Sequence, residues 1–154
     1  MKKQHLFLLA AVCSVAIFSC KDEEPATPTT NTPSTKTAAE LITMKNWKIN
    51  SLTSGATDFW MLVEACNKDN QYRFRSDDSM SIYDMSNKCN STDPDSTASY
   101  YKLYNNNTQL ILNMKLSSTI TIDDTTDVVT LDENTLKINT EYSGLPATIT
   151  FKHP

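Results

Sequence analysis

The chain has 154 residues with 14 basic and 18 acidic side chains, which gives a formal net charge of −4. Nucleic-acid binding requires a basic face against the phosphates, so this balance argues against such a partner. General acid–base catalysis most often uses histidine, and beyond the first 20 residues the sequence has one, His153. We therefore expect a protein that is not an enzyme.

The first 19 residues have the parts of a secretory signal. Lys2 and Lys3 precede an apolar run over residues 6–18, and Ser19 supplies the small residue before the cleavage point. The run is too short for a membrane span, which needs about 20 apolar residues. Removing residues 1–19 takes two lysines and no acids, so the formal net charge becomes −6.

The end of this signal, Ile17-Phe18-Ser19-Cys20, resembles the bacterial lipobox. The resemblance implies that the Cys20 sulfur receives a diacylglycerol, that cleavage makes Cys20 the first mature residue, and that acyl chains such as palmitate hold the protein on a membrane.

The next four residues, Lys21-Asp22-Glu23-Glu24, resemble the signal that exports lipoproteins of Bacteroidetes-type bacteria to the outer surface of the outer membrane. The alternative is a solvated charge run that opens a linker. Residues 20–37 contain Pro25, Pro28 and Pro33 and no large apolar side chain, so we expect a disordered tether.

Two cysteines, Cys66 and Cys89, remain after the signal and the lipidated Cys20 are set aside. An exported protein meets an oxidising environment, which favours a disulfide between them. The alternative is a pair of metal-binding thiolates, but His153 is the one further soft ligand available. The sequence therefore predicts a disulfide and no metal or other cofactor.

The folded segment, residues 38–154, begins with helical signals. Thr37-Ala38-Ala39-Glu40 has the spacing of a capping box and predicts a short helix that ends near Asn46. Trp47, Ile49 and Ser51 then alternate as on one face of a strand. The continuous apolar run over residues 57–66 predicts a second short helix, which ends at Cys66.

From residue 70 onward, short alternating segments predict about eight strands, in which apolar and polar side chains take opposite faces. Asn and Asp supply the turns, because they tolerate positive φ. The expected turns are Asp77-Asp78, Asn105–Asn107, Asp123–Thr126, Asp132–Asn134 and Ser143–Pro146. The expected inward-facing side chains are Trp47, Tyr72, Phe74, Met80, Ile82, Tyr101, Leu103, Leu110, Leu112, Ile120, Leu136, Ile138, Ile149 and Phe151.

Strands with one polar face form an antiparallel sheet that must cover its apolar face. Successive short hairpins, without a long crossover after residue 96, favour an up-and-down barrel over a sandwich. Trp47, the element Cys66-Asn67-Lys68-Asp69-Asn70 and the strand Tyr72-Arg73-Phe74 resemble the lipocalin-like domains of Bacteroidetes surface lipoproteins. That resemblance implies an all-β, eight-stranded lipocalin-like barrel with one or two short N-terminal helices.

Three acidic clusters are candidate catalytic or calcium sites: Asp77-Asp78, Asp93 with Asp95, and Asp123-Asp124 with Asp127. Because each falls in an expected turn, turn formation explains them without catalysis, and none has the spacing of an EF-hand.

The interior of an eight-stranded barrel is either filled by side chains or holds one small ligand. Phe59 and Trp60 are candidates to plug or cover one mouth, and Tyr72, Phe74 and Tyr101 are candidate ligand contacts. Asp95-Ser96-Thr97 resembles an O-glycosylation acceptor, in an expected exposed loop.

The sequence thus predicts a non-catalytic binding module for a small apolar or sugar-like ligand or an envelope protein partner. The alternative is a structural or accessory subunit of an outer-membrane surface complex, with a solid barrel core.

Overall fold

A computed structural model describes residues 35–115, 121–142 and 144–154. The signal, Cys20, the charged segment 21–24 and Ile120 lie outside the described residues, so the statements about them stay predictions. Among the described residues, no helix is long and apolar enough to span a membrane.

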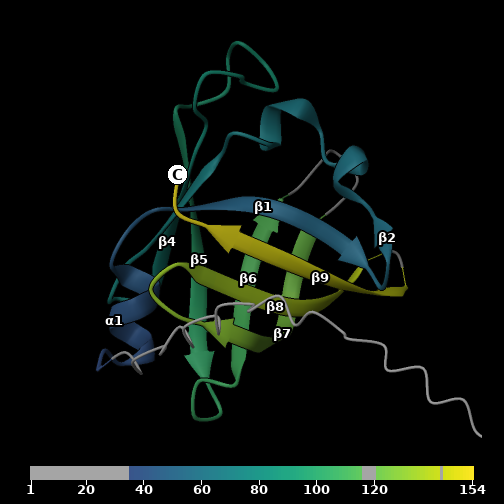
Figure 1. The fold of residues 1–154 in the computed structure, drawn as a ribbon. Helices are drawn as coiled ribbons and strands as arrows, with labels where there is room; N and C mark the ends of the chain where they lie inside the picture. The colour runs from purple at the N-terminus through teal and green to yellow at the C-terminus, as the bar shows by residue number, and fades with distance from the viewer. Residues whose placement is uncertain (1–34, 116–120, 143) are drawn as a thin grey trace, which may run out of the picture. The chain divides into compact units, whose positions relative to one another are not determined.

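Eight antiparallel strands form a closed barrel, which confirms the predicted fold class (Figure 1). Each strand pairs with the next along the chain, and the last strand, β9, pairs with β1 to close the sheet. The barrel strands are β1 (Trp47–Ser54), β3 (Gln71–Phe74), β4 (Ser79–Tyr83), β5 (Ser96–Tyr104), β6 (Gln109–Lys115), β7 (Thr121–Leu131), β8 (Thr135–Tyr142) and β9 (Leu145–Lys152).

The predicted first helix is present as α1 (Ala38–Thr43), and the capping box is complete. The Thr37 side chain accepts from the Glu40 amide, and the Glu40 carboxylate accepts from the Thr37 amide at 2.7 Å. The helix ends earlier than Asn46, with the Thr43 hydroxyl donating to the Ala39 carbonyl. Ile42 is buried, and its carbonyl accepts from the Trp47 indole N–H at 2.8 Å, which fastens α1 to the barrel.

The predicted second helix over residues 57–66 is wrong. The chain forms a two-residue strand, β2 (Thr57–Asp58), that pairs with β1, and then two 3-10 turns, η1 (Trp60–Leu62) and η2 (Ala65–Asn67). The Asp58 carboxylate accepts from the Trp60 amide at 2.7 Å, which favours a tight turn, and Val63 between the two turns is extended. Cys66 therefore lies in a 3-10 turn and not at the end of an α-helix.

One predicted turn lies within a strand, and another is shorter than predicted. Asp123–Thr126 belongs to β7, where it pairs with residues 110–113 of β6. The residues there have turn-type side chains, but the first three are exposed, and the buried Thr126 hydroxyl donates to the Leu110 carbonyl at 2.9 Å. Leu145 and Pro146 open β9, so the last turn is shorter than predicted.

The predicted Asn and Asp turns elsewhere are confirmed. Asp78 and Asn105–Asn107 all have positive φ. A bulge moves the inward face of β1, because its register with β9 shifts between Ile49 and Ser51. Leu52 is consequently buried in place of Ser51.

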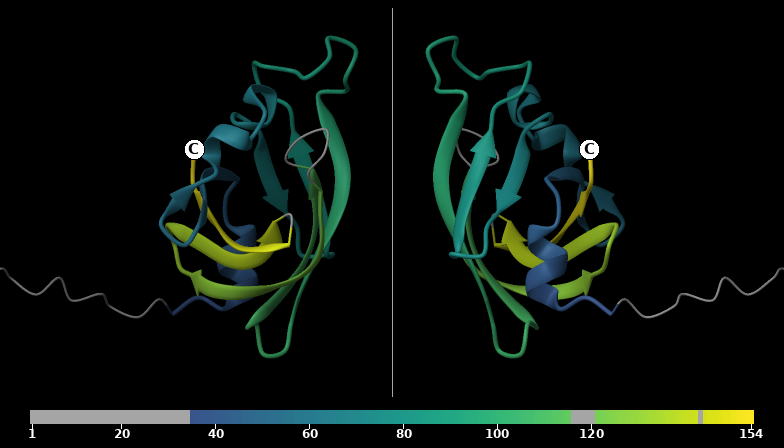
Figure 2. Two further views of the ribbon diagram at one scale, coloured as in Figure 1. Left: turned by 90° about the vertical axis from the view of Figure 1, so that its right-hand side faces the viewer. Right: turned by 90° about the vertical axis from the view of Figure 1, so that its left-hand side faces the viewer.

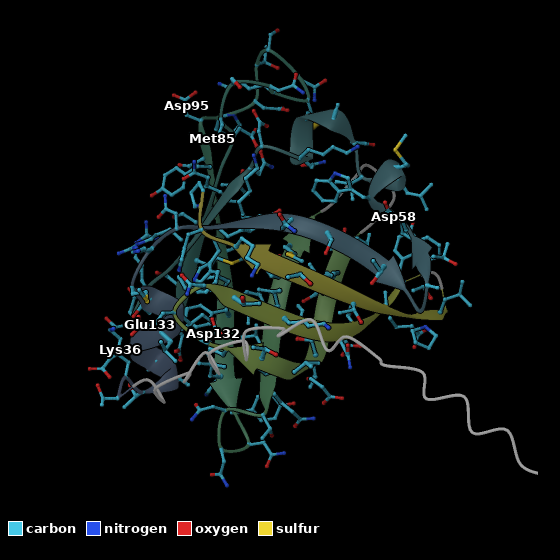
Figure 3. All side chains as sticks on the ribbon, in the orientation of Figure 1. Lys36, Asp58, Met85, Asp95, Asp132 and Glu133 are labelled. Carbon is cyan, nitrogen blue, oxygen red and sulfur yellow. A yellow bond between two sulfur atoms is a disulfide. The ribbon has the colours of Figure 1, made fainter. Side chains whose placement is uncertain are left out.

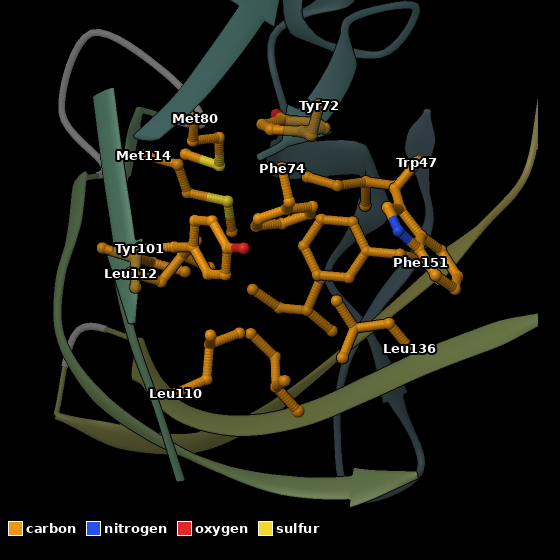
Figure 4. Close-up of a cluster of buried hydrophobic side chains, with 14 of the residues drawn as sticks. Trp47, Tyr72, Phe74, Met80, Tyr101, Leu110, Leu112, Met114, Leu136 and Phe151 are labelled. Atoms are coloured by element: carbon orange, nitrogen blue, oxygen red, sulfur yellow. The ribbon is translucent and has the colours of Figure 1, made fainter. Parts of the chain in front are cut away.

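The barrel interior is filled at its centre by large side chains (Figure 4). Ring pairs interlock there: Tyr72 packs on Phe151 with centroids 5.6 Å apart, and Phe74 packs on Tyr101 at 4.8 Å. Of the predicted inward set, Ile82 and Leu103 are only partly buried. Seven further buried residues are absent from the predicted set: Ile42, Ile49, Leu52, Val63, Met114, Ile122 and Ala147.

A candidate ligand pocket at the disulfide end

The Cys66–Cys89 disulfide is present, with the two α carbons 5.0 Å apart. It joins the η2 turn to the long connection between β4 and β5, residues 84–95, and both segments lie at the same end of the barrel (Figure 2). Figure 3 places Met85 and Asp95 there, away from the Lys36, Asp132 and Glu133 side chains beside α1.

Hydrogen bonds hold the two bridged segments together. One oxygen of the Asp69 carboxylate accepts from the Ser86 amide, the Ser86 hydroxyl and the Asn87 amide at 2.9–3.1 Å. Within the β4–β5 connection, the Lys88 ammonium pairs with Asp95 at 2.6 Å and donates to a backbone carbonyl. The connection is therefore fastened both to the η2 turn and to itself.

Between these segments lies a pocket of about 460 Å³. Its polar lining consists mainly of carboxylates and amides, from Glu64, Asp84, Asp93, Asn67, Asn70 and Asn90. Ile82 and Pro94 add apolar surface. The pocket is thus formed by the η2 turn and the residue before it, the end of β4, the start of β5 and the β4–β5 connection. The disulfide links the η2 turn to that connection.

A buried amide on the pocket wall lacks part of its hydrogen bonding. Asn70 is 2% exposed, and its Nδ2 donates to Asn67 Oδ1 at 3.1 Å, but its own Oδ1 has no partner among the described residues. A buried polar atom without a partner costs about 1–3 kcal/mol. A ligand that donated a hydrogen bond to this oxygen would remove that cost.

Two neighbours of Asn70 along the chain share this feature. The second oxygen of Asp69 and the Tyr72 hydroxyl are buried and have no hydrogen-bond partner among the described residues. Burial, and after it the nearby Asp84 carboxylate, raises the pKa of Tyr72 above its usual range. The Tyr72 hydroxyl therefore stays protonated at neutral pH and is available as a donor.

The aromatic residues predicted as ligand contacts or mouth plugs lie in two settings. Tyr72, Phe74 and Tyr101 are buried in the packed core. Phe59 and Trp60 are partly buried; Phe59 packs on Tyr142 with ring centroids 5.4 Å apart. None of the five lines the pocket at the disulfide end.

A second pocket, of about 500 Å³, is lined by residues of β1, by the C-terminal residues and by basic side chains. Lys48, Lys68 and Lys152 line it together with Trp60, and the Lys68 ammonium lies 5.4 Å from the Trp60 ring centroid. Lys48 and Lys152 are direct cross-strand partners between β1 and β9.

The acidic clusters have local structural explanations. The Asp77 carboxylate accepts from the Ser79 amide and hydroxyl, and these bonds lower its pKa. The Asp93 carboxylate accepts from the Asn90 amide at 2.8 Å. Asp123, in β7, accepts from the Tyr100 hydroxyl at 2.8 Å.

The Glu64 carboxylate and the sulfurs of Cys66 and Cys89 lie within 4.8 Å of one another. Because both sulfurs are in the disulfide, this group has no thiolate to offer a metal. Ser96, the predicted glycosylation residue, is exposed as expected, but it is the first residue of β5 and not part of a loop.

The sequence reasoning missed the pocket residues Glu64, Asn67, Asn70 and Asp84 as a group. The element Cys66–Asn70 carries a family resemblance, and its two asparagines beside a cysteine are the available signal. Asp84 and Asp93 carry no such signal, because only the disulfide and the turns bring them to the same pocket.

No family model matches the chain, and no curated protein matches it. Among solved structures, an uncharacterized protein from Bacteroides eggerthii is similar, at 14% identity and a TM-score of 0.44. The match covers 71% of this chain and 98% of that one.

Proposed function

We propose that the protein is a non-catalytic binding module that holds a small hydroxyl-rich, sugar-like ligand in the pocket at the disulfide end. The observation that carries this proposal is the unpartnered Oδ1 of the buried Asn70 on the pocket wall. Carboxylates and amides are the groups that bind hydroxyls, since they offer strong acceptors and, in the amides, donors. The filled barrel centre leads us to place the ligand at this end and not among the core aromatics.

The proposal also places the protein in the cell envelope. Residues 1–19 would be the lipoprotein signal, Cys20 the lipid attachment site, and residues 21–24 the signal for outer-membrane surface exposure. Protease added to intact cells would then remove the domain, and alanines at positions 21–24 would protect it. Protection of the wild-type domain as well would contradict the surface location.

Binding can be tested with the purified full-length protein and a panel of neutral and amino monosaccharides, followed by two-dimensional amide NMR. We expect at least one sugar to shift signals of residues 64–70 and 82–97, and Asn70→Ala to abolish this response. Asn139→Ala is the matched control, because Asn139 is an exposed amide on β8 outside this pocket. Shifts confined to other regions, or no shift with any sugar, would contradict the proposal.

The filled core also fits the second candidate function, a structural subunit of an envelope complex. Several large apolar side chains are exposed on the described surface, among them Met61, Leu62 and Leu145. Crosslinking in intact cells should then capture one stoichiometric protein neighbour, and its repeated absence would count against this candidate.

A further inference from the structure

The pocket at the disulfide end is acidic as well as polar. Among the described residues, its charged lining side chains are Glu64, Asp84 and Asp93, and no described lysine or arginine lines it. Lys88 is the basic residue on the adjoining connection; its ammonium pairs with Asp95, which does not line the pocket, and donates to the backbone carbonyl of Asp93, which does.

The unpartnered atom on the wall adds an acceptor to these carboxylates. The Asn70 amide nitrogen already donates to Asn67, so the buried oxygen is the atom of Asn70 that still has an open hydrogen-bonding position among the described residues. A carboxylate bonds only groups that donate, and an ammonium has three donors and a full positive charge. A ligand carboxylate or phosphate would instead place like charges together.

We infer that the ligand of this pocket carries a positive charge, as a small hydroxyl-bearing amine such as an amino sugar with a free ammonium. The inference rests on the proposed function and narrows its ligand class. The ammonium would lie among the carboxylates and donate a hydrogen bond to Asn70 Oδ1, and the hydroxyls of the ligand would contact Asn67 and Asn90. A positive ligand complements the carboxylates of this pocket. The pocket should therefore bind neutral and acidic sugars less tightly.

Three sugars with one ring framework differ in charge: glucosamine is a cation, N-acetylglucosamine is neutral and has a larger substituent on nitrogen, and glucuronic acid is an anion. Affinities come from amide NMR titrations of the full-length protein, read from residues 64–70 and 82–97. At low ionic strength we expect glucosamine to bind about tenfold more tightly than N-acetylglucosamine, and glucuronic acid to bind least. This preference should shrink at about 1 M salt, where the Debye length is about 3 Å.

Asp84→Asn removes one pocket charge with little change in shape and should reduce the preference for glucosamine. Asp127→Asn, an exposed acid on β7 outside this pocket, should leave the preference unchanged. If thermal melts show that Asp84→Asn disturbs folding, Glu64→Gln makes the same test.

The outcomes distinguish the two proposals. Equal pocket binding of glucosamine and N-acetylglucosamine, or tighter binding of glucuronic acid, would overturn the charge inference and leave the binding module standing. If none of the three sugars shifts the NMR signals of the pocket residues, the proposed function itself fails.

Discussion

Two buried tyrosines show how much a single hydroxyl depends on its partner. The Tyr101 hydroxyl donates to the Arg75 carbonyl at 2.6 Å, whereas the buried Tyr72 hydroxyl has no partner among the described residues. We expect Tyr101→Phe to lower the free energy of unfolding by about 0.5–1.5 kcal/mol, because the partly buried Arg75 carbonyl loses its donor. Tyr72→Phe in the ligand-free protein should be neutral or stabilising.

Urea unfolding of the two variants, monitored by tryptophan fluorescence, measures this difference. Each substitution removes one oxygen from a buried ring, so each variant is the other's control. A larger loss for Tyr72→Phe than for Tyr101→Phe would show that the Tyr72 hydroxyl is bonded in solution.

The capping box makes a prediction about acid stability. Hydrogen bonds from the Thr37 amide and hydroxyl hold the pKa of Glu40 below its usual value. A carboxyl with a lowered pKa stabilises the folded state above its unfolded pKa, and the contribution is lost as the pH falls through the folded pKa. The wild type should therefore exceed Glu40→Gln in stability at neutral pH, and the difference should shrink below about pH 4. A difference that stays constant down to pH 2 would contradict this role of the charge.

At the scale of elements, the sequence predicted the strands well and the η1–η2 segment badly. Strands such as β6 alternate strictly, so the pattern alone predicts that Leu110 and Leu112 face inward, and both are buried. Residues 57–66 form a largely apolar run without strand alternation, which predicted a helix. The hydrogen bond from the Trp60 amide to the Asp58 carboxylate instead favours a tight turn. The pocket that this segment builds could not be predicted, because it depends on how non-local segments meet at the disulfide.

The disulfide should stabilise the pocket more than the sheet. Replacing both Cys66 and Cys89 by serine should lower the free energy of unfolding by about 3 kcal/mol, because the unfolded chain loses a closed loop spanning a separation of 23 residues. Hydrogen exchange should rise first in residues 59–70 and 84–95, since few ladder bonds hold them, and last in β8 and β9. Uniform acceleration across the barrel would contradict a local role for the bridge.

The basic pocket contains two lysines at paired positions of neighbouring strands, and one substitution should remove the repulsion between their charges. Lys48 and Lys152 face each other across β1 and β9, and like charges directly opposite destabilise a sheet. Lys48→Glu should raise the free energy of unfolding by about 0.2–1 kcal/mol at low salt, and the gain should decrease as salt is added. Lys102→Glu, at an exposed site on β5 opposite Ile111, is the control that should show no such gain. A loss of stability in Lys48→Glu alone would show that the lysines are compensated in another way.

At the scale of the whole molecule, β1 pairs with two neighbouring barrel strands over very different lengths. β1 pairs with β9 over most of its length but with β3 only through Trp47 and Lys48. The η turns and the disulfide-linked connection lie where β3 begins and β4 ends, so the weakly paired end of the barrel is also the end with the candidate ligand pocket. The architecture thus combines a packed core, which positions the pocket, with non-repetitive segments that form it.

The most direct test of this account is native mass spectrometry of the protein purified gently from its own host. The account predicts a retained small molecule that carries an amine, lost from Asn70→Ala and kept by Asn139→Ala. Repeated spectra of the empty chain would contradict a ligand in this pocket, and so would a molecule retained equally by both variants.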